Sequence, residues 1–116
     1  MTIQRMDHVG VVVDDLEAAI AFDIAMMRTP DGHGRLELTK FHTPTAVSAE
    51  PENAPGNTLG LRSIMFAVDD IDATVAGLRA HGAELVGEVA QYQDSYRLCY
   101  VRGPEGIIVA LAEQLS

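Results

Sequence analysis

Few residues of this sequence combine a reactive side chain with a spacing that supports chemistry, and Glu37 is the first of them. It stands between Leu36 and Leu38, so in a strand its carboxylate faces the side opposite to both leucines. If that side is a cleft, partial burial favours the protonated form of Glu37. The alternative is a strand residue that faces solvent. The single cysteine, Cys99, is expected to be packed, because no nearby group would activate its thiol.

Composition limits the class of protein. The 116 residues carry a formal net charge of −9, which repels phosphate backbones and acidic membranes, so we expect neither nucleic acid nor membrane as a partner. The apolar runs are too short to cross a bilayer and no leader is visible, so we expect a cytoplasmic protein. One cysteine excludes an intrachain disulfide and fits a reducing compartment. The acidic surface would suit a cationic ligand, but acidity alone also serves solubility.

The sequence contains an internal repeat. Residues 8–21 align with residues 63–76 at a constant offset of 55 (63 − 8). In both copies an apolar, β-branched run ends in Val-Asp-Asp and a pattern of helical spacing follows, which predicts a strand and then a helix. The paired aspartates are predicted to cap these helices rather than to bind ligands. The predicted buried stripe of the second helix consists of Ile71, Thr74, Val75 and Leu78, and His81-Gly82 is its predicted end.

A turn of the type Pro-acid-Gly follows in each copy, at residues 30–32 and 104–106, and each turn is predicted to enter a strand. Between the copies, the Pro- and Gly-rich residues 43–60 predict a linker. The chain is therefore expected to be one domain of two modules, at about 1–42 and about 61–116.

The two copies differ in length. From the second Asp of each pair to the Arg before each turn, the first copy is shorter by 19 positions (32 − 13). Helix-like residues run directly into strand-like residues at Phe22 and Asp23, with no Gly, Pro or Asn between them. Two hypotheses remain open: a genuine deletion, or a segment missing from the sequence at this junction.

Four phrases in this order, at residues 7–16, 35–38, 66–71 and 102–106, resemble the vicinal-oxygen-chelate superfamily. Its members include glyoxalase I, methylmalonyl-CoA epimerase, extradiol dioxygenases and bleomycin-resistance proteins. The resemblance implies an α+β fold of tandem βαβββ-type modules, whose curved mixed sheets form a cleft, with the first module shortened. It also implies a homodimer. A shared fold does not specify the reaction, because one fold hosts many chemistries.

The resemblance also implies a metal site. Enzymes of this family place one ligand on the first strand and one on the last strand of each module, usually His, then Glu or Gln, then His, then Glu. The corresponding residues here are His8 and Glu37, then Ser63 and Ala110, so half of the set lacks a good donor. Catalytic zinc keeps about three protein ligands. We therefore expect His8 and Glu37 to hold a zinc, nickel, manganese or iron ion only weakly, or no metal at all.

Other side chains are weaker candidates for this site. Strand alternation places His42 on the face opposite to Glu37, and Glu113 on the face opposite to Ala110. The loop residue His33 has no predictable direction. The residues expected to contact a ligand are Ser63, Met65, Tyr96, Arg97 and Ala110.

Three functional hypotheses are compatible with these residues. In the first, a glyoxalase/bleomycin-resistance-like protein with a degenerate metal site binds a small organic molecule, with lyase or isomerase chemistry that rests on Glu37 and His8. In the second, a metal-free protein sequesters its ligand, as resistance members of the family do. In the third, the chain is a structural remnant without a ligand. The sequence leaves the substrate, the metal and the question of catalysis open.

Overall fold

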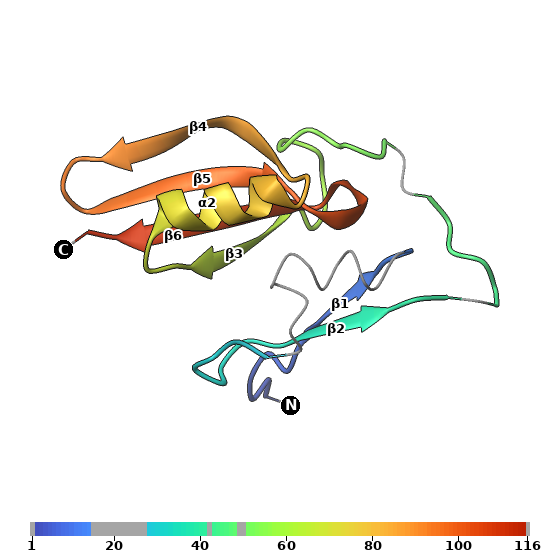
Figure 1. Ribbon diagram of the computed structural model, residues 1–116. Coiled ribbons are helices and arrows are strands. Elements are labelled where there is room, and N and C mark those ends of the chain that lie inside the picture. Colours follow the sequence, from blue (N-terminus) through green and yellow to red (C-terminus); the bar gives the residue numbers. More distant parts are fainter. Residues whose placement is uncertain (1, 15–27, 42, 49–50, 116) are drawn as a thin grey trace. The chain divides into compact units, whose positions relative to one another are not determined.

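The computed structural model describes residues 2–14, 28–41, 43–48 and 51–115, and the chain forms two compact units, Met1–Ser48 and Ala49–Ser116 (Figure 1). The first unit contains strands β1 (Val9–Val12) and β2 (Leu36–Thr39). The second contains β3 (Ser63–Ala67), α2 (Ile71–Ala80), β4 (Glu84–Tyr92), β5 (Tyr96–Arg102), the 3-10 helix η1 (Pro104–Gly106) and β6 (Ile108–Gln114). This combination confirms the predicted α+β class.

Part of the first copy of the repeat lies outside the described residues. This part holds the helix and strand predicted around residues 18–27, together with the junction of Phe22 and Asp23. Both hypotheses about that junction therefore stay predictions. Within the residues that are described, no helix is long and apolar enough to cross a bilayer.

The sheet of the first unit consists of a parallel strand pair. β1 lies beside β2 with Val9 opposite Leu36, and backbone hydrogen bonds continue the pairing beyond the end of β1 to Val13. Alternation separates the two faces of this pair. Val13 is buried and packs against Val11 and Leu38 on one face, which leaves the polar side chains on the other.

Both predicted Pro-acid-Gly turns are present. In each, the backbone N–H of the residue before Pro30 or Pro104 closes the turn with a hydrogen bond of 2.7 Å. Gly32 and Gly106 adopt φ angles of 79° and 74°, a region that glycine enters without steric cost. Each turn therefore leads the chain into a strand, β2 in the first unit and β6 in the second.

The sheet of the second unit has the order β3-β6-β5-β4, with β3 and β6 parallel and the other neighbours antiparallel. Helix α2 lies across one face of this sheet (Figure 1). The buried apolar side chains of the helix and of the strands are Ile71, Val75, Leu78, Cys99, Val101, Val109 and Leu111. On β5 the buried Cys99 and Val101 alternate with more exposed residues, whereas residues 108–111 of β6 are all buried. The core of this unit lies where the buried side chains of these strands meet α2.

Helix α2 begins and ends as its sequence predicts. The Asp70 carboxylate accepts a hydrogen bond from the backbone N–H of Ala73 (3.0 Å), and Glu113 on β6 accepts one from Ile71 (2.8 Å). Both bonds satisfy N–H groups that have no partner inside the helix. The helix ends at His81 and Gly82, whose φ is 95°. The contact of Glu113 with the helix also confirms that its side chain faces away from the face that carries Ala110.

Candidate functional site

The two units contain the same parallel strand pair in the same register. Gly10 lies opposite Glu37 across β1 and β2, and Met65 lies opposite Ala110 across β3 and β6. The residue two positions before Gly10 is His8, and the residue two positions before Met65 is Ser63. The register therefore gives each unit one equivalent diagonal pair on one face, His8 with Glu37 and Ser63 with Ala110.

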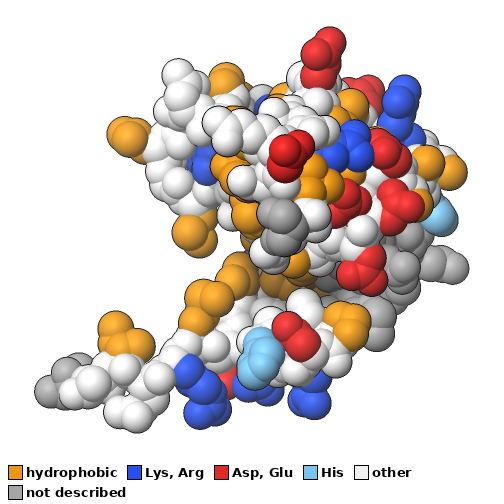
Figure 2. Space-filling view, turned by 90° about the vertical axis from the view of Figure 1, so that its left-hand side faces the viewer, with side chains coloured by type: hydrophobic (Ala, Val, Ile, Leu, Met, Phe, Trp, Pro, Cys, Tyr) orange, Lys and Arg blue, Asp and Glu red, His pale blue; other side chains and the backbone are white. Residues whose placement is uncertain are grey.

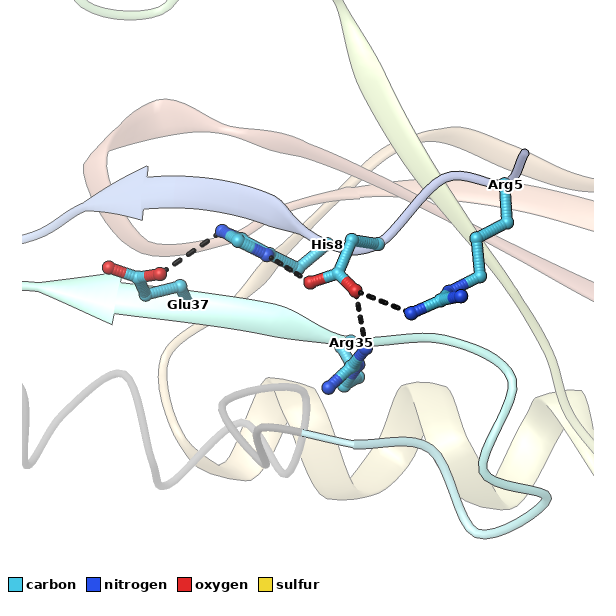
Figure 3. Close-up of polar contacts among 5 residues, drawn as sticks. Arg5, His8, Arg35 and Glu37 are labelled. Atoms are coloured by element: carbon cyan, nitrogen blue, oxygen red, sulfur yellow. Dashed lines mark hydrogen bonds and ion pairs between the residues drawn. The ribbon is translucent and has the colours of Figure 1, made fainter. Parts of the chain in front are cut away.

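In the first unit this diagonal pair is in contact. The Nε2 atom of His8 lies 3.1 Å from Oε2 of Glu37, and the two side chains are 42% and 55% exposed. Figure 3 shows both side chains on the same face of the β1–β2 pair. This distance agrees with the prediction that these two residues lie together. The Glu37 side chain is half-exposed, and the apolar contacts of its strand pair lie on the opposite face. That the Glu37 face lines a cleft stays a prediction.

Two residues that the sequence left without a role complete this cluster. The Asp7 carboxylate contacts Nδ1 of His8 through Oδ2 (2.9 Å) and accepts a hydrogen bond from Arg35 through Oδ1 (2.6 Å) (Figure 3). Arg5 reaches the same Oδ1 at 3.4 Å. Asp7 directly precedes His8, and Arg35 precedes Glu37 by two positions on the same face of β2. These two spacings are the sequence features that could have indicated Asp7 and Arg35 as neighbours of the His8–Glu37 pair.

The charges around Asp7 favour its ionised form. The hydrogen bond with His8 and the positive charge of Arg35 hold the pKa of the Asp7 carboxyl below its ordinary value. The cluster is therefore a row of alternating groups, a guanidinium, a carboxylate, an imidazole and a second carboxylate. An imidazole nitrogen beside a carboxylate oxygen can bind a divalent metal ion or pass a proton.

The second unit carries no such donors at its diagonal pair. Ser63 is exposed, and Ala110 is only 1% exposed although it lies on the face away from α2. Its neighbours across the sheet are Met65 on β3 and Tyr100 on β5. The side chain at position 110 is thus a small, buried apolar group between larger residues, and it offers no donor atom to a metal.

Aromatic and apolar side chains share the face of the sheet that carries Ala110. Tyr96 shares the face through strand alternation and stacks on Tyr92, with ring centroids 4.8 Å apart. Tyr92, Tyr96 and Tyr100 are 47%, 41% and 41% exposed, and Met65 is 56% exposed. Four of the five predicted ligand contacts, Ser63, Met65, Tyr96 and Ala110, therefore share one open face of the sheet. Tyr92, which pairs with Tyr96 across the sheet, and Tyr100, four positions after Tyr96 on β5, share this face.

Arg97, the fifth predicted ligand contact, lies on the other face, and this corrects its expected placement. Its guanidinium donates two hydrogen bonds to Asp72 in the first turn of α2, at 2.8 and 3.0 Å. These bonds raise the pKa of Arg97 and lower that of Asp72. The physical reason is alternation, because Arg97 precedes the buried Cys99 by two positions and points to the same side.

The remaining candidates do not join either face. His33 lies in the exposed turn before β2, and the ring of His81 contacts the backbone oxygen of Gly77 at the end of α2. His42 lies outside the described residues. Burial raises the pKa of the Cys99 thiol, which agrees with a packed cysteine. Across the part of the chain that the structure describes, no group of three or more His, Cys, Asp or Glu side chains is arranged to hold a metal.

Two units that each contain a parallel strand pair in the same register, with one diagonal pair per unit, are typical of proteins of the glyoxalase type. The chain belongs to the Glyoxalase/Bleomycin resistance protein/Dioxygenase superfamily, whose family model matches residues 23–111. Glu37 lies within the matched residues, whereas Asp7 and His8 precede them. The assignment of His8 therefore depends on the strand register.

Individual relatives agree with this family. The crystal structure of a glyoxalase family protein from Bacillus cereus shares 40% identity and a TM-score of 0.89, over 100% of this chain and 97% of that chain. A glyoxalase/dioxygenase from Nostoc punctiforme has a TM-score of 0.72 at 17% identity, covering 94% of this chain and 90% of its own, which supports the fold alone.

A further relative is known by its sequence, and its name states neither a family nor a reaction. The uncharacterized protein YaeR of Escherichia coli K12 is 32% identical over 84 residues, which is 72% of this chain. The match spans only 61% of the E. coli protein. None of these three names states a substrate.

Proposed function

We propose that this chain is a glyoxalase/bleomycin-resistance-like protein that binds a small organic molecule and holds a divalent metal weakly between His8 and Glu37. The observation that carries the proposal is the contact of 3.1 Å between Nε2 of His8 and Oε2 of Glu37. The repeated strand register supports it, because it explains why two residues far apart in sequence meet on one face.

The donor chemistry fits part of a metal site. Ligand bonds of about 2.1 Å to zinc place neighbouring donor atoms about 3.4 Å apart at the tetrahedral angle. The separation of the two side-chain atoms is 3.1 Å. Gly10 lies opposite Glu37, and a Cβ added to Gly10 would meet no atom within 4 Å, so this face has room beside the pair. Two donors fall short of the usual three, so we expect weak binding.

The proposed chemistry is of lyase or isomerase type. A divalent metal supplies charge that polarises two neighbouring oxygens of a ligand. Glu37 is the proposed catalytic residue, because its carboxylate can take a proton from the ligand and return it. His8 is the second proposed donor to the metal, through Nε2. Since Ser63 and Ala110 add no donor, we expect no turnover of the methylglyoxal–glutathione adduct.

The open face of the second unit is the proposed surface for the organic ligand. Ser63, Met65, Tyr96 and Ala110 lie on it, and aromatic side chains offer contact area at low cost in side-chain entropy. Family members that are enzymes or resistance proteins handle small molecules. We also propose a homodimer, as members of the family often form, and a cytoplasmic location.

Metal titration tests the proposal. Nickel, zinc and manganese are titrated into the metal-free chain by calorimetry, and into His8→Ala, Glu37→Ala and the matched control His33→Ala. We expect one weak site per chain, at least about tenfold weaker in His8→Ala and Glu37→Ala because each loses one of the two donors, and unchanged in His33→Ala. Binding that all three variants retain, or no binding at high micromolar metal, would remove the metal from the proposal.

Metal-free sequestration of a cationic molecule is the second candidate function. The net charge of −9 favours it, and carboxylates lie exposed beside hydrophobic side chains on the surface in Figure 2. Calorimetry with bleomycin, a cationic glycopeptide, in the presence of a chelator separates the two functions. Binding that persists with the chelator and in Glu37→Ala would favour sequestration. Binding of nickel without any binding of bleomycin would favour the first function.

A further inference from the structure

We infer that Asp7, held by Arg35, is the positioning residue that directs the imidazole of His8 toward Glu37. The inference rests on the proposed function, because it assigns a purpose to the direction of the His8 ring. It concerns two side chains that lie outside the family's usual ligand positions.

The two oxygens of Asp7 are divided between two strands. Oδ2 contacts Nδ1 of His8, the residue that leads into β1, at 2.9 Å. Oδ1 accepts a hydrogen bond of 2.6 Å from Arg35, which leads into β2. A carboxylate bonded at both oxygens cannot rotate freely, so the contact from Arg35 fixes the direction in which Asp7 meets the His8 ring.

The direction of the ring decides which nitrogen faces Glu37. An imidazole ring can turn over, and its neutral form can carry the proton on either nitrogen. His8 is 42% exposed, so packing alone does not restrain it. The Asp7 and Glu37 carboxylates can both only accept. The contact of Nδ1 with Asp7 is the shorter of the two, at 2.9 Å against 3.1 Å, and we therefore expect the neutral ring to carry its proton on Nδ1. Nε2 is then left toward Glu37, at 3.1 Å.

The second unit shows that strand pairing does not require this arrangement. At the positions equivalent to Asp7, His8, Arg35 and Glu37, it carries Arg62, Ser63, Ile108 and Ala110. The strands β3 and β6 still pair in the same register as β1 and β2. If Asp7 and Arg35 only joined two parallel strands, an equivalent would be needed there. Instead, the second unit lacks the Asp–Arg pair and the His–Glu pair together. This connects Asp7 and Arg35 with the His8–Glu37 pair.

Two measurements on the metal-free and nickel-titrated chain test this. Nitrogen NMR at about pH 8.5, above the ordinary histidine pKa of about 6.5, reports which ring nitrogen of neutral His8 carries the proton. We expect the proton on Nδ1 in the unchanged chain, a shift toward the Nε2 form of free histidine in Asp7→Ala, and an intermediate state in Asp7→Asn, whose amide oxygen still accepts. Nickel affinity is expected to fall about 10–100-fold in Asp7→Ala.

The two arginines provide a matched pair of variants. Arg35→Met and Arg5→Met each remove one positive charge beside Oδ1 of Asp7, but the contacts measure 2.6 and 3.4 Å. We expect a severalfold loss of nickel affinity and a mixed His8 ring form in Arg35→Met, and less than a twofold change in Arg5→Met, because a contact at 3.4 Å is a weak hydrogen bond.

The outcomes separate this inference from the proposed function. If nickel binds the unchanged chain and Asp7→Ala keeps both its affinity and its Nδ1 proton, the inference is overturned and the metal site stands. If nickel does not bind the unchanged chain, the metal proposal fails. The proton position in Asp7→Ala and Asp7→Asn then still decides whether Asp7 directs the ring. Because Asp7→Asn keeps the shape of the side chain, a folding defect in Asp7→Ala does not prevent that decision.

Discussion

The units Met1–Ser48 and Ala49–Ser116 use the same parallel strand pair for different purposes. In the first, the face that carries Gly10 and Glu37 is polar and holds His8 against the carboxylate. In the second, the equivalent face carries Met65 and the buried Ala110 and presents aromatic side chains. The strand register is therefore preserved where the donors are not.

The difference shows that the main buried core and the charged cluster belong to different units of this fold. Among the described residues, the larger buried core belongs to the second unit, where α2 covers the sheet. The charged cluster belongs to the first unit and lies opposite the apolar contacts of Val13. Substitutions in the two units are therefore expected to have different consequences, for stability in the second and for metal affinity in the first.

The largest expected effect is on the core of the second unit. Ile71 on α2 is 0% exposed, so Ile71→Ala removes buried methyl and methylene groups and leaves a cavity. We expect the free energy of unfolding to fall by about 2–5 kcal/mol, as measured by urea denaturation. Ile3→Ala is the control, because Ile3 is 91% exposed, and it should change stability by less than about 0.5 kcal/mol.

The same variant tests the separation of packing from chemistry. Where Ile71→Ala remains folded, its nickel affinity should equal that of the unchanged chain. A parallel loss of nickel affinity would contradict the separate roles of the two units.

Donors placed in the second unit should recreate the missing pair. In a His8→Ala background, Ser63→His with Ala110→Glu adds an imidazole and a carboxylate in the register that His8 and Glu37 occupy. Ala110 is only 1% exposed, so the larger side chain should cost about 1–3 kcal/mol. Nickel at about 100 times its Kd should then recover about 2.7 kcal/mol, seen as a rise in Tm.

The single substitutions provide the controls for this variant. Neither Ser63→His nor Ala110→Glu alone, in the same background, should gain stability from nickel, because each has only one new donor. An equal gain in a single and in the double variant would show that the register does not bring positions 63 and 110 together as donors.

The cap of α2 has a smaller expected effect. Asp70→Ala removes the hydrogen bond of 3.0 Å to Ala73 and should cost about 1 kcal/mol in urea denaturation. Asp69→Ala, which changes the neighbouring exposed carboxylate, should cost less than about 0.5 kcal/mol. The repeat predicts the same role for Asp15, which lies outside the described residues, so Asp15→Ala compares the two copies directly. A cost at Asp69 as large as that at Asp70 would contradict the capping role.

The local features of the second unit could be predicted from the sequence because short-range rules set them. The buried stripe of α2, its cap at Asp70, its end at Gly82 and the turn before β6 all follow from helical spacing and turn chemistry. The diagonal pair of His8 and Glu37 followed from the family resemblance.

Other features needed the structure. The expected packing of Cys99 already indicated the face that Arg97 shares, two positions earlier, but the pairing of Arg97 with Asp72 required the position of α2. The roles of Asp7 and Arg35 depend on how β1 and β2 are aligned, because their contact joins residues 28 positions apart. Strand alternation alone also could not show that the face carrying Glu37 is half-exposed.

The smallest expected effect is the pH dependence of the ion pair between Asp72 and Arg97. The hydrogen bonds from Arg97 hold the pKa of Asp72 below its ordinary value. Such a carboxylate stabilises the folded chain above the unfolded-state pKa of about 3.9, and the contribution is lost as the pH falls through the lower folded-state pKa. Asp72→Asn should therefore lower Tm slightly at about pH 7, and the difference should vanish well below pH 3.9. The effect is small because the Asp72 side chain is 70% exposed, and added salt should reduce it further.

Asp94→Asn, in the turn between β4 and β5, is the matched control. A difference for Asp72→Asn that stays the same at both pH values would show that packing around α2, and not charge, connects this helix to the sheet. The contrast between the apolar second unit and the charged cluster of the first would then be sharper.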